Sequence, residues 1–181
     1  MKIGLFSDSH GNVKNLKAVA DYLVKEAKVD MLVHLGDDYD DTRVLDKYKI
    51  PVVKIPGVFS SYYKDPKIEN RVIRDFEGTK ILISHTDKVH ENDLPDDLDP
   101  EEVVSAKLVK AVFYGHTHIP LVDERNGILF VNPGHLKDED KKGFLPSFAV
   151  VEIKDGEIEA TVLSLKNKTK IVSGKLFSST V

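Results

Sequence analysis

The chain has 181 residues, of which 41% are hydrophobic and 31% are charged, and this balance predicts one globular domain rather than a disordered chain. Its formal net charge of −4 argues against a nucleic-acid platform that works through a broad basic face. The chain contains no cysteine, which excludes disulfides and thiolate metal sites, so a transition-metal site would have to use His, Asp, Glu or Asn side chains.

The first half of the chain predicts strands that alternate with helices. The predicted strands are "KIGLFSD", "MLVHLGD" and "PVVKIPG". Between the first two, residues 12–29 carry apolar side chains at helical spacing behind Asn12, which suits an N-cap, and "TRVLDKYK" predicts a short second helix. This order predicts parallel βαβ units with right-handed crossovers.

The second half predicts antiparallel strands. They are "RVIRDF" with "KILISH", then "AVFYG", and then a pair of strands around a glycine-containing turn in each of residues 120–134 and 147–165. The acidic segment 87–102 predicts a loop that ends at a helix start capped by Asp99. We therefore expect one domain over residues 1–166, with two sheets packed face to face and helices outside, and a tail, 167–181, that either adds an edge strand or frays.

Four short motifs lie where a predicted strand gives way to a loop. They are "SDSHGN", "HLGDD", "LISHT" and "GHTH", and they contribute Asp8, His10, Asp37, His85, His116 and His118. Because the carboxyl ends of parallel strands share one edge of a sheet, we expect these side chains to gather there. In "DSH" and "HTH" the polar residues are two positions apart, which in an extended backbone aims both side chains to one side. The neighbouring Gly11, Gly36 and Gly115 suit a backbone that turns sharply or passes close to another group.

Two carboxylates and four imidazoles can hold two divalent ions, with one carboxylate bridging them. Mixed nitrogen and oxygen ligands favour Mn, Fe, Zn or Ni over Mg or Ca. Each motif alone also fits a polar loop with an isolated histidine, but the occurrence of all four in order favours a metal site.

These motifs, together with "NPG" at residues 132–134, resemble those of the calcineurin-like metallophosphoesterases, and most closely the small single-domain YfcE-type branch. The resemblance extends from Met1 to about Gly134. It implies a four-layer α/β/β/α sandwich and two metal sites. One site would use Asp8, His10, Asp37 and His118, the other Asp37, His85 and His116, with Gly36, Gly115 and Asn132 in support.

The resemblance also implies a metal-dependent hydrolase for a small phosphorylated substrate, a phosphodiester or a monoester. One or two ions of Mn, Ni, Zn or Fe would clamp the phosphate while a metal-bound hydroxide attacks phosphorus in line. The alternative is a non-catalytic metal-binding scaffold, like the retromer subunit that shares this fold. The sequence has no signal-peptide core and no apolar run of the roughly 18 residues that a membrane span needs, so we expect a cytoplasmic protein. It assigns no oligomeric state and no natural substrate.

One family motif is broken. After the third strand the family has Gly-Asn-x-Asp/Glu, whose Asn binds the second metal, and in many members a following His assists the leaving group. Here Gly57 is followed by Val58 and Phe59. The second metal site therefore lacks a donor, and we expect it to bind its ion weakly, to fill the position with water, or to be empty.

Three further histidines have other expected roles. His34 precedes Asp37 within a strand and is expected to be a hydrogen-bonded core histidine. His90 lies in the acidic loop and is expected to be solvated, unless loop motion brings it to the site, whereas His135 follows "NPG" and can approach the metals. The neighbouring Tyr62 and Tyr63 either stack on a base or sugar or cover the edge of the core.

Overall fold

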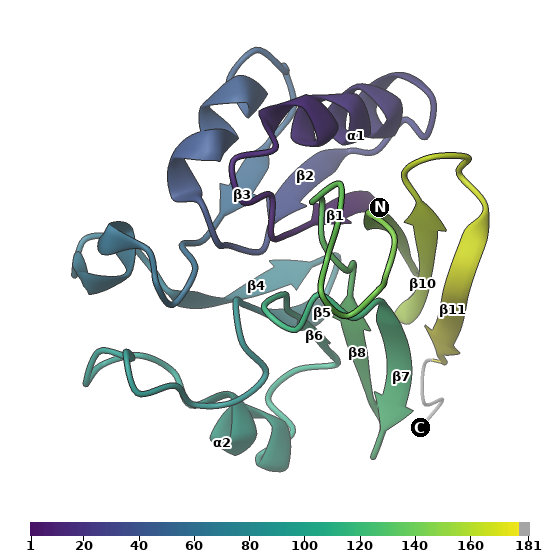
Figure 1. Cartoon of the computed structure of the whole chain (residues 1–181). Helices are drawn as coiled ribbons and strands as arrows, with labels where there is room; N and C mark the ends of the chain where they lie inside the picture. The colour runs from purple at the N-terminus through teal and green to yellow at the C-terminus, as the bar shows by residue number, and fades with distance from the viewer. Residues whose placement is uncertain (178–181) are drawn as a thin grey trace.

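The computed structural model describes residues 1–177 and contains two sheets (Figure 1). The first has the strand order β11-β10-β9-β1-β2-β3 and the second β4-β5-β6-β8-β7. The strands of the first sheet are β1 (Lys2–Phe6), β2 (Met31–His34), β3 (Val52–Lys54), β9 (Ser147–Lys154), β10 (Glu157–Ser164) and β11 (Lys170–Leu176). Those of the second are β4 (Arg71–Phe76), β5 (Thr79–Ser84), β6 (Ala111–Phe113), β7 (Leu121–Arg125) and β8 (Ile128–Asn132).

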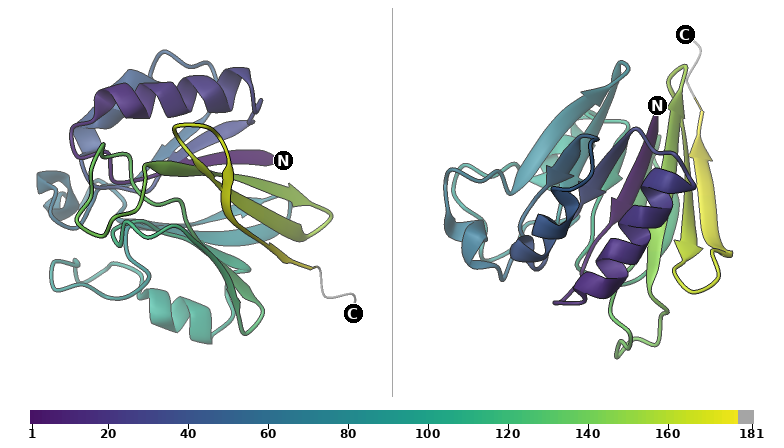
Figure 2. Two further views of the ribbon diagram at one scale, coloured as in Figure 1. Left: turned by 45° about the vertical axis from the view of Figure 1, so that its right-hand side comes forward. Right: turned by 90° about the horizontal axis from the view of Figure 1, so that it is seen from above.

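The helices lie outside the two sheets (Figure 2). They are α1 (Val13–Lys25) and α2 (Pro100–Ser105), with the 3₁₀ helices η1 (Tyr39–Leu45) and η2 (Ser61–Lys64). Helix α1 covers the outer face of the first sheet and α2 that of the second, which confirms the expected four-layer sandwich of two mixed sheets. The short helix expected over "TRVLDKYK" starts earlier, as the 3₁₀ helix η1.

Both helices begin where the sequence places a capping side chain. The Asn12 side chain accepts a hydrogen bond from the backbone N–H of Asn15 at 3.1 Å, and the Asp99 carboxylate accepts one from that of Glu101 at 2.8 Å. Pro100 then occupies the first turn of α2, where a missing N–H has no effect.

The core lies mainly between the sheets. Leu5 and Val33 of the first sheet and Ile83 and Phe113 of the second belong to one buried cluster. On the other face of the first sheet, Leu16, Val19 and Leu23 of α1 pack in a second cluster. Burying each such side chain contributes about 1.5–3 kcal/mol, so both faces of the first sheet hold its strands in register.

Strand β1 has neighbours from both ends of the chain. Ile3 pairs in parallel with Met31 of β2 and antiparallel with Val151 of β9. In the second sheet β4 pairs with β5 and β7 with β8 as antiparallel hairpins, but β5, β6 and β8 are mutually parallel, so the expectation of an antiparallel second half is wrong for these three strands. The carboxyl ends of β1 and β2, and of β5 and β6, therefore open into the loops that carry the four motifs.

The segment after β10 adds an edge strand. Strand β11 pairs antiparallel with β10 and forms one edge of the first sheet. Residues 178–181 of the expected tail lie outside the described residues. None of the helices within residues 1–177 is long and apolar enough to cross a membrane.

Candidate metal centre

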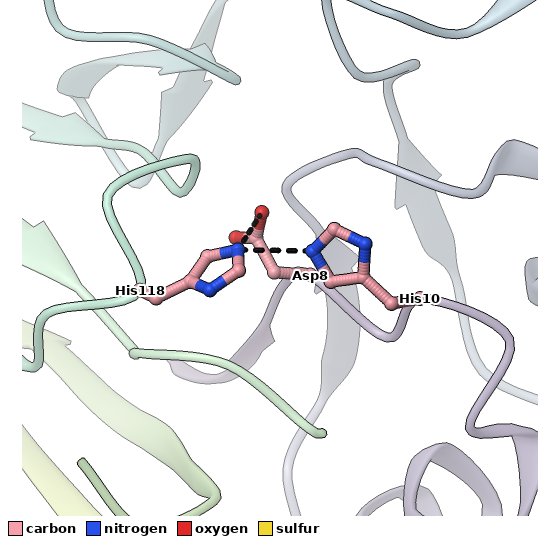
Figure 3. A group of neighbouring side chains, drawn as sticks. All are labelled: Asp8, His10 and His118. Carbon is pink, nitrogen blue, oxygen red and sulfur yellow. Dashed lines mark hydrogen bonds and ion pairs between the residues drawn. The ribbon is translucent and has the colours of Figure 1, made fainter. Parts of the chain in front are cut away.

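The loops after β1, β2, β5 and β6 meet at one edge of the sandwich. Two groups of possible ligand atoms each lie within 4.8 Å of one another there. The groups are Asp8, His10 and His118 (Figure 3), and Asp8, Asp37 and His85. His116 belongs to neither group, but its ring centroid lies 5.1 Å from that of His85. All six residues from the motifs are therefore neighbours.

The backbone at this centre is strained. Five of the six residues have positive φ angles: Asp8 53°, His10 46°, Asp37 91°, His116 63° and His118 61°. The expectation of an extended backbone in "DSH" and "HTH" is wrong. Left-handed conformations at such residues cost of order 1–3 kcal/mol each and persist only where surrounding structure enforces them, which is typical of functional sites.

The two histidines of "HTH" serve different parts of the centre. His116 faces His85, whereas the Nε2 atom of His118 lies 2.9 Å from His10 Nε2 and 3.3 Å from Asp8 Oδ1 (Figure 3). We call His10 and His118 the His118 side, and His85 and His116 the His85 side. Asp8 and Asp37 lie between them, and the carboxylate common to both groups is Asp8.

Asn132 holds the loop that carries "GHTH". Its side-chain N–H groups donate to the Gly115 carbonyl at 2.7 Å and to Thr117 Oγ1 at 3.0 Å, while its Oδ1 accepts from the Gly134 N–H at 2.9 Å. A Cβ atom on Gly115 would lie 2.7 Å from Asp8 Oδ2, closer than side-chain atoms approach. Gly115 therefore lets this loop lie against the end of β1.

The His118 side presents converging lone pairs. His118 Nδ1 lies 2.7 Å from Asp140 Oδ1, so this nitrogen carries a hydrogen and donates it. The neutral ring then directs the Nε2 lone pair at Asp8 and at His10. Electron-rich atoms this close require a proton or a cation between them. Accordingly the pKa of His118 is raised, first by its hydrogen bond to Asp8 and also by Asp140, although burial opposes this.

Asp140 was not found from the sequence. Its side chain is only 5% exposed and also accepts the backbone N–H of Lys142 at 2.9 Å. Burial would raise the pKa of Asp140, but the hydrogen bonds from His118 and Lys142 outweigh this and hold the carboxyl well below its usual range. A carboxylate behind a ligating histidine fixes the ring's tautomer and orientation. Spacing could not distinguish Asp140 from Asp138 in the same acidic segment.

The Asp8 carboxylate is buried and that of Asp37 is partly buried. Burial would raise the pKa of Asp8, but the hydrogen bond with His118 and the nearby His85 lower it from 3.8 to about 2. The Asp37 Oδ2 atom lies 2.8 Å from His10 Nδ1, yet without hydrogen-bond geometry, so this buried oxygen has no hydrogen-bond partner within residues 1–177. A buried carboxylate oxygen without a donor fits a position that binds a cation.

The tautomer of His85 also suits a ligand. His85 Nδ1 lies 2.7 Å from the Leu35 carbonyl oxygen and must donate to it, which leaves the Nε2 lone pair free. A Cβ atom on Gly36 would lie 2.6 Å from His85 Nδ1, and Gly36 has a φ of 102°, so the close approach requires glycine. Burial, followed by the electrostatic effect of the nearby His85 imidazole, lowers the pKa of His116 and favours its neutral form.

The segment with the broken motif follows the edge of the centre. A Cβ atom on Gly57 would lie 2.4 Å from the Asp37 Cα, so this loop packs directly on Asp37. Val58 is 1% exposed, and its carbonyl accepts a hydrogen bond from the Asn92 side chain at 3.0 Å. The loop thus buries an apolar side chain at the position where the resemblance leads one to expect an amide donor.

Two of the remaining histidines are structural. His34 is fully buried in the core, and its Nδ1 accepts from the Gly36 N–H at 3.3 Å; burial lowers its pKa to about 4. His135 lies near His118, with ring centroids 5.3 Å apart. Its Nδ1 accepts from the Lys137 N–H at 3.1 Å, and its Nε2 donates to the Phe144 carbonyl at 3.0 Å. With both nitrogens occupied by backbone, His135 has no lone pair for a metal.

His90 differs from its expectation. It is half-buried rather than solvated, with its ring 5.4 Å from that of Phe59 and 6.0 Å from that of His116. Of the tyrosine pair, Tyr63 is 1% exposed and covers the core edge. The Tyr62 ring packs on that of Tyr39 at 4.8 Å.

Comparison with known proteins shows which family has this sequence and fold. Residues 1–156 match the calcineurin-like phosphoesterase superfamily domain. The chain is 26% identical to the protein named phosphodiesterase MJ0936 of Methanocaldococcus jannaschii, over 87% of this chain and 94% of that one.

Solved structures have the same fold. The phosphoesterase YfcE of E. coli superposes with a TM-score of 0.73 at 20% identity, covering 98% of this chain and 100% of that one. A single mutant of Vps29 from Entamoeba histolytica gives 0.67 at 18% identity, covering 97% and 98%. With the sequence match over most of its length and this shared fold, the chain belongs to the calcineurin-like phosphoesterase superfamily.

Proposed function

We propose that this protein is a metal-dependent phosphoesterase that hydrolyses a small phosphodiester. One observation carries the proposal. The carboxylates of Asp8 and Asp37 and the neighbouring imidazoles bring their oxygen and nitrogen atoms together at one edge of the sandwich. The family and the relative named as a phosphodiesterase support the same reaction class.

The proposed ligands follow the two sides of the centre. One ion would be held by Asp8, His10, Asp37 and His118, and a second by Asp37, His85 and His116. Nitrogen and oxygen donors of this kind suit Mn, Ni, Zn or Fe. When bound, such ions neutralise phosphate charge and activate water for attack on phosphorus.

The protein's own groups would orient the ligands. Asp140 holds the His118 ring, and the His116 N–H donates to Asp8 Oδ2 at 2.9 Å. The choice of a diester rests on the relative named as a phosphodiesterase.

The second candidate is a non-catalytic interaction scaffold, and the fold shared with Vps29 fits it. The buried Val58 also favours it, because a donor is missing on the His85 side. The partners that fix the tautomers of His118 and His85 suit metal binding in either candidate, so the relative named as a phosphodiesterase is what favours the enzyme.

The test is turnover of bis-p-nitrophenyl phosphate and p-nitrophenyl phosphate by chelator-treated protein supplied with Mn, Ni or Zn. We expect metal-dependent release of nitrophenol, faster from the diester. Absence of turnover of both esters by protein shown to contain metal would contradict the proposed function and favour the scaffold.

A further inference from the structure

His90 is held at the rim of the centre by a buried network. The Arg71 side chain, 1% exposed, pairs with Asp93 at 2.8 Å and donates to the Lys88 carbonyl at 3.1 Å. Asp93 Oδ2 in turn accepts the backbone N–H of His90 at 2.8 Å. The segment that carries His90 is therefore tied to β4 of the second sheet.

The same segment is tied to the loop with the broken motif. The Asn92 side chain donates to the Val58 carbonyl at 3.0 Å, and Lys64 donates to the Asn92 carbonyl at 2.7 Å. Next to Val58, the Phe59 ring lies against His90 and is 73% exposed. Two loops from different parts of the chain thus place an imidazole and an exposed aromatic ring together.

The hydrogen bonds of His90 define its chemistry. Its Nδ1 lies 3.1 Å from the backbone nitrogen of Asn92, and a backbone N–H can only donate, so Nδ1 is the acceptor. The neutral ring must then carry its hydrogen on Nε2, which makes no protein hydrogen bond in the described part of the chain. A metal ligand would need a lone pair on Nε2. In this tautomer His90 is therefore suited to donate a hydrogen bond from Nε2 and not to ligate a metal through it.

We propose that His90 and Phe59 form a substrate subsite beside His116, in which the Nε2–H of His90 donates a hydrogen bond to a phosphate oxygen and the Phe59 ring contacts an apolar ester group. This inference rests on the proposed phosphoesterase function. It assigns the substrate class as a phosphodiester with at least one planar or apolar ester group. No covalent or proton-transfer step is assigned to His90.

The experiment compares His90→Ala, His90→Gln and Phe59→Ala with the control Val89→Ala, which changes an exposed side chain of the same segment. The measurements are kcat/KM on bis-p-nitrophenyl phosphate and on methyl p-nitrophenyl phosphate, and metal content. Because hydrogen bonds to charged groups are among the stronger ones, we expect His90→Ala to lower kcat/KM by about 10–100-fold on both esters. His90→Gln, which keeps an N–H donor, should stay within several-fold of wild type.

Phe59→Ala should lower kcat/KM more on the bis-aryl ester than on the methyl ester. The subsite is contradicted by unchanged kinetics in His90→Ala, by His90→Gln falling as far as His90→Ala, or by equal losses on both esters in Phe59→Ala. A loss of bound metal in His90→Ala would also overturn it, because His90 would then be a ligand.

Failure of the proposed function gives a different result. If metal-loaded wild type turns over neither ester, the phosphoesterase proposal fails, and calorimetry with inorganic phosphate then tests the His90 donor alone. Weaker phosphate binding by His90→Ala than by wild type would support the donor. Equal binding by the two proteins would overturn it.

Discussion

The His118 side and the His85 side of the centre differ in the side chains that contact their histidine rings. His118 has a buried carboxylate on Nδ1, and its Nε2 faces Asp8 and His10. On the His85 side, His116 is bordered by the rings of Phe59 and His90. We therefore propose that the His118 side holds an ion without help, whereas the His85 side leaves a position that a substrate can complete. The comparison predicts unequal metal affinities, and four changes can break or sharpen it.

The largest effect is expected for His10→Ala. This change removes a ligand from the side with the fuller donor set, so about one ion per chain should be lost. Metal ions contribute several kcal/mol of transition-state stabilisation, so kcat/KM should fall by about 10³-fold or more. Elemental analysis beside a turnover assay measures both effects. Wild type and variant with equal metal occupancy would show that His10 is not a ligand.

Asp93→Asn should lower the free energy of unfolding, because Asp93 ties the segment of His90, next to the His85 side, to Arg71. It leaves the buried guanidinium of Arg71 without its charged partner, and breaking such a pair costs about 3–5 kcal/mol. Because the Asp93 side chain is 15% exposed, we expect the lower end of that range in denaturant unfolding. The exposed Asp96→Asn in the same segment is the control. If metal affinity at the tighter site falls as well, the two sides are not independent.

Asp140→Asn should weaken only the His118 side. An amide is a poorer acceptor for the Nδ1–H of His118 and gives the ring less support. Changes behind a ligand typically lower metal affinity by about 10–100-fold. Asp138→Asn is the matched control, since Asp138 is exposed and its oxygen accepts from Asn15 rather than from a histidine. The measurement is a calorimetric metal titration. If the weaker binding step is affected instead of the tighter one, the tighter step does not belong to the His118 side.

The smallest effect is expected for Val58→Asn. Wild type should titrate in two unequal steps or in one, and an added amide oxygen should tighten the weaker step by about tenfold at most, or ~1.4 kcal/mol. Val58 is buried, so an amide that fails to reach the ion would instead cost about 1–3 kcal/mol of stability. A lower melting temperature with an unchanged titration would contradict the missing-donor account.

The sequence predicted the layers and the gathering of the ligands for a clear physical reason. Buried apolar runs that end at Asp8 and Asp37 define parallel strands, and parallel strands bring their ends to one edge. The alternation of strands and helices, followed by hairpins, was enough to predict two packed sheets with helices outside, but not the parallel pairing of β6 with β5 and β8.

The sequence could not predict the partners that reach the centre from distant loops. Asp140 meets His118 and Asp93 meets Arg71 only after the sandwich has formed, and no local spacing marks either pair. For the same reason the sequence could not decide between a solvated His90 and one at the site, since its position depends on Phe59 and on the path of its own segment. The positive φ angles were missed because polar alternation suggests extended backbone, whereas tight turns achieve the convergence.

The position of β1 has a consequence for biosynthesis. Strand β1 precedes the other described strands in the chain, whereas its neighbour β9 follows about 150 positions later. At about 5–20 residues per second, the ribosome needs roughly 10–30 s to deliver that neighbour. Until then, the first strand has an open edge and Asp8 lacks its bond to the Leu136 N–H. A nascent chain that lacks residues 136–154 therefore lacks these contacts beside the proposed metal centre, and we expect ion loading to follow synthesis of β9.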